Sequence, residues 1–281
     1  MRRKATAILY LFCWLGYVTV SAQQKLYIDQ KGYLSTDVVV YDANDNAHIF
    51  RALINTSSYV CSIDSSAFSS LNLGTTPKED SYIEGAYGNY QKSKETIIPK
   101  LSLSGSIFEE IPTAVYNFGV NSTYKMVIGA SILDGRAWAI NQVDSTIQVV
   151  EKADKGYIAD IMLYRGKKKQ NARHFLLIPL KIEGQSILAV FNTGTNGIGL
   201  TKKIDGLDWT PEVFEETDYG PFHYNARHQE KLVDAHVEVS KWETVTTVKY
   251  VPMLAFNMVG NSLLSGHKYV LDYKKNRIYL Y

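Results

Sequence analysis

Two stretches of the chain determine its fold, because one is a second version of the other. Residues 188–200 are LAVFNTGTNGIGL, and residues 51–63 are RALINTSSYVCSI. When the two stretches are aligned, Asn192 falls on Asn55, and both are followed by threonine. A repeat of this kind predicts an architecture built from similar units.

A second pair of segments extends the repeat toward the end of each copy. VIGASIL at 127–133 aligns with MVGNSLL at 258–264, which places Gly129 on Gly260. From these glycines the two copies continue for 18 residues without a gap, to an isoleucine in each. We therefore expect the duplication to include nearly the whole chain after its first residues.

The segments between these motifs have the pattern of β-strands. Short runs rich in Val, Ile, Thr and Tyr, such as TDVVVYD, HFLLIPLKIEG and NRIYLY, alternate with turn signals such as DANDN and IEGQS. A short helical turn is expected at SSAFSSLNL (65–73). The sequence predicts an all-β protein of two similar β-barrel-like lobes, 23–152 and 174–281, with a charged linker at 153–173 and a cleft between the lobes.

The first 22 residues have the features of a signal peptide. Three basic residues at positions 2–4 precede an apolar run at 5–20, and Val20-Ser21-Ala22 has small residues where a signal peptidase cleaves. The apolar run is shorter than a membrane span of about 20 residues, although an uncleaved anchor is the alternative. We expect an exported protein with no stable membrane span after cleavage.

Cysteine content and charge restrict the compartment and the partners. Removal of residues 1–22 leaves Cys61 as the one cysteine, so no internal disulfide can form. A large exported domain without disulfides indicates a bacterial periplasm or cell surface. The formal charge falls from +2 to about −1, which argues against nucleic acid as a partner.

The order of these motifs resembles the pepsin and retropepsin superfamily of aspartic peptidases, and most closely its bacterial exported two-lobe members. The loop and glycine motifs are 74 residues apart in the first copy (Asn55 to Gly129) and 68 apart in the second (Asn192 to Gly260). The resemblance implies that each lobe brings one loop to a shared site. It also implies that each glycine lets the backbone pass close behind its loop.

In that family both loops carry a catalytic aspartate, whereas this chain has Asn55 and Asn192. Two adjacent carboxyl groups share one proton, so that one is an acid while the other is a base. An amide has no such proton-accepting state near neutral pH, and each lost acid–base group typically costs about 10²–10⁴-fold in rate. We therefore expect no active catalytic residue.

The other loop positions keep the family's pattern with one departure. The resemblance implies that Thr56 and Thr193 form hydrogen bonds across the lobes and that Gly194 allows a tight turn. Ser57 occupies the matching place in the first loop. The residues predicted to line a binding cleft are Thr56, Ser57, Thr193, Gly194 and Thr195.

A flap over the cleft is predicted at residues 81–93, SYIEGAYGNYQKS. Tyr82, Tyr87 and Tyr90 could stack on a ligand there, because tyrosine combines a large contact area with a polar tip. The alternative is a surface hairpin whose tyrosines pack on their own strand. The second lobe has an aromatic segment at 218–229.

Other acidic groups are weak replacements for the missing carboxylates. Asp64 is expected to cap the turn that follows it, and Asp205 and Asp208 lie similarly downstream of Asn192. Asp272 aligns with Asn141, which favours a structural role.

The histidines do not form a recognisable metal motif. His223, His228 and His236 lack helical spacing and neighbouring cysteines, so we expect no metal and no cofactor.

The combined features predict a catalytically inactive, aspartic-protease-like protein that binds a peptide or protein partner in its cleft. One alternative is a weak or unusual endopeptidase that uses the same cleft, which requires an acidic group within hydrogen-bonding reach of both asparagines. Another is a structural module of an exported complex, with its cleft filled by its own side chains.

Overall fold

The protein is almost entirely β-structure. Strands account for 57% of the computed structural model and helices for 6%, which confirms the all-β prediction. The structure describes residues 22–30, 32–73, 78–84, 90–119, 122–166, 175–212, 229–252 and 254–281. The predicted signal peptide therefore lies outside the described residues, apart from its last residue.

The first lobe is a closed six-strand barrel. Its strands are hydrogen-bonded in the order β2-β3-β8-β4-β7-β6, and β6 pairs with β2 to close the barrel. The pairs β3–β8 and β4–β7 are parallel, and the other neighbours are antiparallel. The strands are β2 (Leu34–Tyr41), β3 (Ala47–Ile54), β4 (Cys61–Asp64), β6 (Tyr90–Leu103), β7 (Ser106–Tyr116) and β8 (Met126–Ile128). Strand β5 (Lys78–Glu84) extends the sheet from β6.

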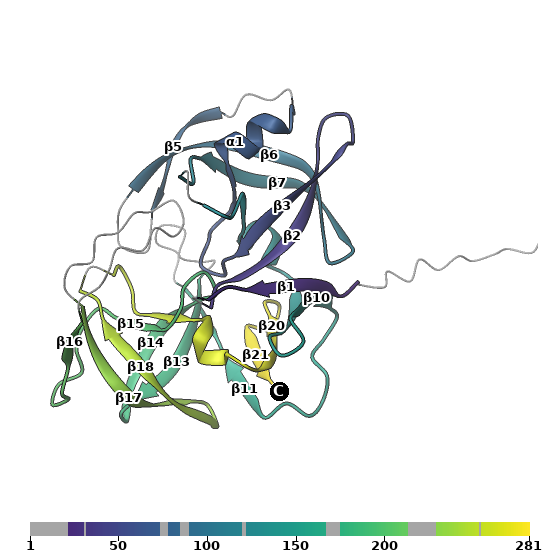
Figure 1. The fold of residues 1–281 in the computed structure, drawn as a ribbon. Coiled ribbons are helices and arrows are strands. Elements are labelled where there is room, and N and C mark those ends of the chain that lie inside the picture. Colours follow the sequence, from purple (N-terminus) through teal and green to yellow (C-terminus); the bar gives the residue numbers. More distant parts are fainter. Residues whose placement is uncertain are drawn as a thin grey trace, which may run out of the picture.

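The second lobe repeats this arrangement (Figure 1). Its order is β13-β14-β19-β15-β18-β17, with β17 paired back to β13, and β14–β19 and β15–β18 are its parallel pairs. The strands are β13 (Leu176–Ile182), β14 (Gln185–Asn192), β15 (Ile198–Leu200), β17 (Gln229–Val239), β18 (Trp242–Tyr250) and β19 (Met258–Gly260). Strand β16 (Thr210–Glu212) pairs with β17.

The register confirms the internal repeat. Ile54 pairs with Ile128 in the first barrel, and the aligned Phe191 pairs with Val259 in the second. In each pair, the first residue directly precedes the asparagine of the loop, and the second directly precedes the glycine of the later motif. Duplicated sequence has therefore folded into duplicated topology.

A third sheet joins the two lobes. Its strands are ordered β11-β21-β20-β9-β10-β1 and all pairs are antiparallel. The matched strands β9 and β20 lie side by side at its centre. The strands are β1 (Gln24–Ile28), β9 (Ala137–Asn141), β10 (Thr146–Val150), β11 (Ala159–Met162), β20 (Lys268–Asp272) and β21 (Arg277–Leu280).

The segment predicted as a linker, 153–173, is partly structured. Strand β11 pairs with β21, and β12 (Tyr164–Arg165) pairs with β13, so this segment contributes to two sheets. Ala159 and Ile161 alternate with more exposed neighbours, but a four-residue alternation is too short to be distinctive in a charged segment. Residues 167–173 of the predicted linker lie outside the described residues.

Alternation of side chains explains why these segments form barrels. In β13, Leu176, Ile178, Leu180 and Ile182 are buried while the residues between them face outward. Burial of a side chain of this size contributes about 1.5–3 kcal/mol relative to exposure. A one-residue shift in register would move this whole set to solvent.

The predicted turns are present. Glu183 and Gly184 connect β13 to β14 with φ values of 48° and 77°, as a two-residue hairpin of the mirror-image type requires. The Asp42 side chain accepts hydrogen bonds from the backbone N–H groups of Asn44 and Asn46, at 2.9 Å and 2.8 Å, within the turn between β2 and β3.

The helical elements are short. The expected helical turn is α1 (Ser65–Ser70), and the described residues also contain α2 (Ala130–Leu133) and the 3₁₀ turn η2 (Asn261–Leu264). The last two occupy matched places directly after Gly129 and Gly260.

Candidate functional site

The two predicted loops meet where the lobes touch. Thr56 and Thr193 form a reciprocal set of four hydrogen bonds. The Thr56 hydroxyl donates to the carbonyl oxygen of Phe191 at 2.7 Å, and the Thr193 hydroxyl donates to that of Ile54 at 2.8 Å. Each hydroxyl oxygen also accepts the backbone N–H of the other threonine, at 3.2 Å for the Thr56 N–H and 3.1 Å for the Thr193 N–H.

These hydrogen bonds join residues 137 positions apart in sequence. Both threonines are buried, with exposures of 1% or less, so solvent cannot replace a lost partner. The cross-lobe role expected for the two threonines is what the structure shows. The lobes are therefore held in register at the positions that carry Asn55 and Asn192.

Two glycines allow the backbone to pass directly behind the loops. A Cβ atom on Gly129 would lie 2.3 Å from the carbonyl oxygen of Val60, and one on Gly260 would lie 2.5 Å from that of Thr195. Backbone atoms cannot move aside as a flexible side chain can, so neither position has room for a larger residue. The structure confirms the close passage expected at both glycines.

The Asn55 and Asn192 amides have a defined orientation. Asn55 Oδ1 accepts the Ser57 N–H at 3.0 Å and the Ser57 hydroxyl at 2.9 Å. Asn192 Oδ1 accepts the Gly194 N–H at 2.8 Å. A flipped amide would point its own N–H groups at these donors, so the backbone determines which atom of each amide faces it.

The two amides are close together. A Cβ atom built on Gly194 would lie 2.8 Å from Asn55 Nδ2 and 3.1 Å from Asn192 Oδ1. Those two atoms are therefore no further apart than the sum of these distances. Asn192 is 4% exposed and Asn55 is half-buried. The chain thus brings the aligned asparagines together at one site.

Asp64 has the capping role expected for it. Its side chain accepts hydrogen bonds from the Ser66 N–H at 3.1 Å, from the Ser66 hydroxyl and from the Phe118 N–H at 2.9 Å. Burial acts to raise the pKa of this carboxyl. The hydrogen bonds and the nearby Lys125 outweigh burial and keep the pKa below its usual value. This carboxylate is already occupied by its own partners.

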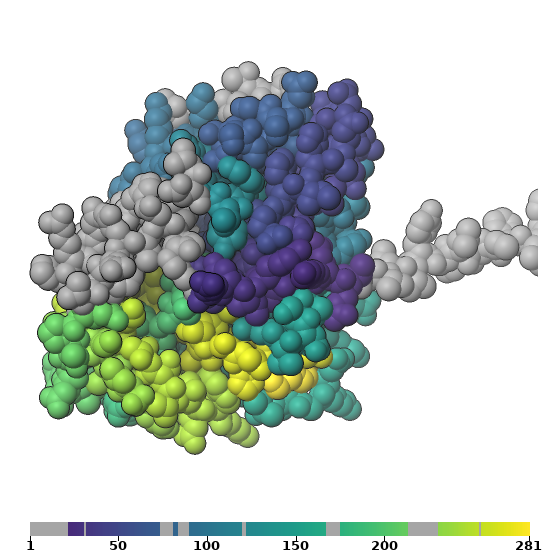
Figure 2. Space-filling view, in the orientation of Figure 1, coloured from purple at the N-terminus to yellow at the C-terminus, as the bar shows by residue number. Residues whose placement is uncertain are grey.

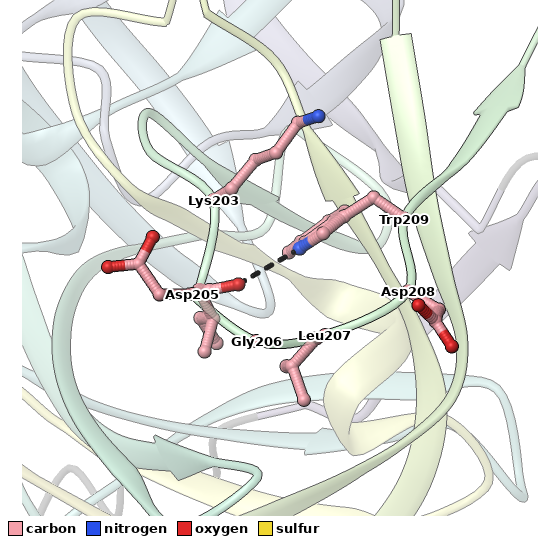
Figure 3. Close-up of a pocket in the computed structure, with 7 residues that line it drawn as sticks. Lys203, Asp205, Gly206, Leu207, Asp208 and Trp209 are labelled. Atoms are coloured by element: carbon pink, nitrogen blue, oxygen red, sulfur yellow. Dashed lines mark hydrogen bonds between the residues drawn. The ribbon is translucent and has the colours of Figure 1, made fainter.

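The remaining candidate acids also lie in other surroundings. Figure 3 shows Asp205 and Asp208 pointing away from each other in the loop 203–209, which lines a hollow of about 410 Å³. The loop is closed by a hydrogen bond from Trp209 Nε1 to the carbonyl oxygen of Ile204 at 3.1 Å. Asp272 accepts the Lys275 N–H in a turn. Within the described part of the chain, no carboxylate forms a hydrogen bond with Asn55 or Asn192.

The predicted flap is formed by β5 and β6. Tyr82 and Tyr90 are 68% and 67% exposed, so these two rings are not packed on their own strands. Tyr87 and the tip of the flap at 85–89 lie outside the described residues, as does most of the aromatic segment 218–229. Thr195, half-buried, uses its carbonyl oxygen to accept the Asn261 N–H at 3.0 Å.

A buried polar cluster that the sequence analysis did not identify supports the second loop. Asn261 Oδ1 accepts hydrogen bonds from Gln142 at 2.9 Å and Tyr269 at 3.2 Å, and Asn261 Nδ2 donates to the carbonyl oxygen of Gly32 at 3.1 Å. The aligned residue in the first copy is Ala130. The polar Asn261 in place of an apolar alanine was the sequence signal that could have pointed to this cluster. Figure 2 shows the N-terminal segment, in purple, lying between the two lobes.

The described histidines and cysteine do not form a metal site. His236 contacts Glu243 at 3.1 Å on the surface, whereas His223 and His228 lie outside the described residues. Among the residues whose placement is described, no group of three His, Cys, Asp or Glu side chains could hold a metal ion. Burial raises the pKa of Cys61 to about 11, so the thiol is protonated near neutral pH.

In the described ranges, none of the helices has the length and apolar character required to cross a membrane.

No family model matches this chain, and no curated protein matches it either.

Proposed function

We propose that this protein belongs to the pepsin and retropepsin superfamily and has lost hydrolysis. In this proposal the cleft between its lobes binds an extended peptide or a partner protein without cleaving it. The chain acts after export, at a bacterial periplasm or cell surface. The observation that carries the proposal is the pair of buried Asn-Thr loops joined by reciprocal threonine hydrogen bonds.

The chemistry of the two amides supports the loss of hydrolysis. Attack of water on a peptide bond requires one group to take a proton and another to supply one. Both Oδ1 atoms accept hydrogen bonds from their own loops, and an amide does not titrate near neutral pH. The protein therefore has a side chain at each position of an acid–base pair, but neither side chain can gain or lose a proton near neutral pH.

The exposed tyrosines support a role in binding. Tyr82 and Tyr90 are on the hairpin formed by β5 and β6, and both rings are mostly accessible to a ligand. Aromatic rings with a polar tip are favourable contacts for peptides. Both lie on the first lobe, which is where the resemblance expects a flap.

Hydrolysis of a defined peptide pool from pH 3 to pH 8 tests the catalytic part of this proposal. We expect no cleavage by the native protein. The double variant Asn55→Asp/Asn192→Asp should cleave at acidic pH, because two adjacent carboxyl groups share a proton. Its rate should exceed any residual rate of the native protein by at least about 10²-fold.

Two outcomes contradict the catalytic part. If the native protein cleaves as fast as the double variant, the two asparagines have not abolished catalysis. If the folded double variant also fails to cleave, the amides are not the reason for inactivity. The single variants Asn55→Asp and Asn192→Asp are matched controls, since each supplies only one carboxyl group.

Affinity selection from the same pool, followed by mass spectrometry, tests the binding part. The native protein should retain a subset of peptides in intact form, and Tyr82→Ser or Tyr90→Ser should reduce their recovery. Tyr164→Ser is a matched control, because Tyr164 is also an exposed tyrosine but lies on β12 of the other lobe. Equal losses in all three variants would contradict a binding role for the flap.

A further inference from the structure

Each lobe has a hollow at the same place in the repeat. In the first lobe a hollow of about 460 Å³ lies between α1 and the strands β6 and β7 (Figure 1). In the second lobe the loop 203–209 lines the hollow of about 410 Å³. Helix α1 directly follows β4, and the loop 203–209 comes after the matched strand β15. Both volumes lie in the range of small-molecule sites, about 300–1,000 Å³.

The floor of the first hollow is apolar, and lysines stand at its rim. Phe68 of α1 and Val115 of β7 line it and are 9% and 7% exposed. Lys94 of β6 is the cross-strand neighbour of Val115, so the two side chains lie on the same face of the sheet. Lys92, two residues earlier in β6, shares that face. The hollow therefore places an apolar surface next to exposed ammonium groups.

The charge of the first hollow is positive. Its described lining contains the two lysines and no acidic residue. Lys94 forms no ion pair within the part of the chain that the structure describes, so its charge is available to a ligand. Ser65 of α1 adds a hydroxyl group to the lining. An anionic group attached to an apolar chain therefore matches both parts of this hollow.

The matched hollow of the second lobe has the opposite character (Figure 3). Its lining includes two exposed carboxylates, Asp205 and Asp208, and one lysine, Lys203. That lysine already forms an ion pair with Glu230. A carboxylate ligand would therefore meet negative charge in the second lobe and positive charge in the first. The repeat thus supplies a control hollow within the same molecule.

We propose that the first hollow binds a small amphipathic acid, in which a short apolar chain carries a carboxylate. The apolar chain covers Phe68 and Val115, and the carboxylate meets the ammonium group of Lys94. Two sources of this chemistry are a free aliphatic acid and the C-terminal carboxylate of a peptide that ends in an apolar residue. The hollow is lined by none of the residues of the paired Asn loops, so this site does not depend on the proposed function.

Titration of the full chain by ¹H–¹⁵N NMR tests this inference with small probes. Hexanoate should shift the backbone N–H signals of Ser65, Ser69 and Lys94 saturably, whereas hexylammonium should not. Butyrate should bind more weakly than hexanoate, because each methylene that becomes buried tightens binding by up to about fourfold. Hexanol should bind about tenfold more weakly than hexanoate, because it lacks the charge. Tighter binding of hexanoate or of N-acetyl-leucine identifies the source of the carboxylate.

The variant Lys94→Gln tests the role of the charge. Lys94 is exposed, so its replacement should leave the fold intact. We expect hexanoate to bind about tenfold more weakly to this variant, while binding of hexanol stays unchanged. Lys203→Gln is the matched control, since it removes the same charge from the rim of the second hollow and should leave hexanoate binding unchanged.

Four outcomes overturn the inference. The first is the absence of a saturable shift with hexanoate, and the second is equal affinity for hexanol and hexanoate. The third is equal weakening of hexanoate binding in Lys94→Gln and Lys203→Gln. The fourth is a hexanoate response of the loop 203–209 as strong as that of α1, which would show that the probe does not distinguish the two hollows. Failure of peptide selection in the cleft would reject the proposed function and leave this site unaffected.

Discussion

The two loops at the lobe interface share a framework and differ at the position two residues after each asparagine. In each, an asparagine oxygen accepts the N–H two residues later, and a threonine hydroxyl bonds to the backbone of the other lobe. The first loop has Ser57, whose hydroxyl gives Asn55 an additional hydrogen bond. The second has Gly194, where a Cβ atom would lie 2.7 Å from Asn55 Cγ.

This difference shows that joining the lobes and shaping the site depend on different positions of the duplicated loop. The threonines join the lobes in both copies, and the glycines behind the loops allow the same close backbone passage in both. The position two residues after each asparagine differs between the copies, and at Gly194 the Asn55 amide lies directly against the second loop. The duplicated elements are therefore equivalent in holding the lobes together and unequal in shaping the site.

The largest expected effect tests whether the threonines are equivalent. Thr193→Val would leave the Ile54 carbonyl and the Thr56 N–H without partners, and Thr56→Val would do the same to Phe191 and Thr193. A buried unpaired group costs about 1–3 kcal/mol, and each variant leaves two. We expect similar losses in the free energy of unfolding, measured by urea denaturation.

Thr113→Val is the matched control for the threonine variants. Thr113 is also buried, but its hydroxyl donates to the Ile111 carbonyl in the same strand at 3.0 Å. Its replacement removes a hydroxyl without touching the lobe interface. A large loss for one interface threonine and none for the other would show that the loops are not equivalent.

The next effect concerns the position where the loops differ. Gly194→Ala should destabilise the protein by about 1–3 kcal/mol, because its Cβ atom would press on the Asn55 amide. The same variant should shift the Asn55 side-chain NMR signals. Gly199→Ala is the control, since its Cβ atom would meet only the terminal Cδ1 atom of Leu254, which can move. An unchanged Asn55 signal in Gly194→Ala would contradict the close approach.

Acid sensitivity should also distinguish the lobes. Asp64 caps α1 in the first lobe, whereas the aligned Thr201 has no carboxyl group. Because the folded pKa of Asp64 is below its usual value, its stabilisation is complete above the unfolded pKa of about 3.9. That stabilisation is lost as the pH falls through the folded pKa.

Asp64→Asn should therefore lower stability at pH 7 by about 1–3 kcal/mol and reduce the loss of stability below about pH 4. Urea denaturation at pH 7 and between pH 2 and pH 4 measures both effects. Asp205→Asn serves as the control, because Asp205 is exposed on the loop 203–209. Equal pH profiles for the native protein and Asp64→Asn would remove Asp64 from the explanation of acid sensitivity.

The sequence was sufficient to predict the features that depend on repetition and strand alternation. It predicted two β-lobes, the meeting of Asn55 with Asn192, and the close passage at Gly129 and Gly260. These follow because an aligned repeat places equivalent residues at equivalent points of each lobe.

Features that depend on contacts between distant segments could not be predicted in the same way. The charged segment before residue 167 contains β11 and β12, whose partners come from the last strand and from β13. Asn261 bonds to Gln142 and to the carbonyl of Gly32, which are 119 and 229 residues away in sequence. No local pattern indicates such partners.

The smallest expected effect comes from Ser57, whose hydroxyl bond to Asn55 is present in the first loop alone. Ser57→Ala keeps the Cβ atom and the N–H bond to Asn55 but removes the hydroxyl bond at 2.9 Å. Because Ser57 is half-buried, we expect a loss of only about 0.5–1 kcal/mol. One lone pair of Asn55 Oδ1 then becomes free. The Asn55 side-chain signal should shift in the ¹H–¹⁵N NMR spectrum of Ser57→Ala, while Ser58→Ala, whose hydroxyl donates to the carbonyl oxygen of Val60, should leave it unchanged. If Ser57→Ala leaves the Asn55 signal unchanged, the serine hydroxyl does not bond to the amide, and the difference between the loops would be one of packing alone.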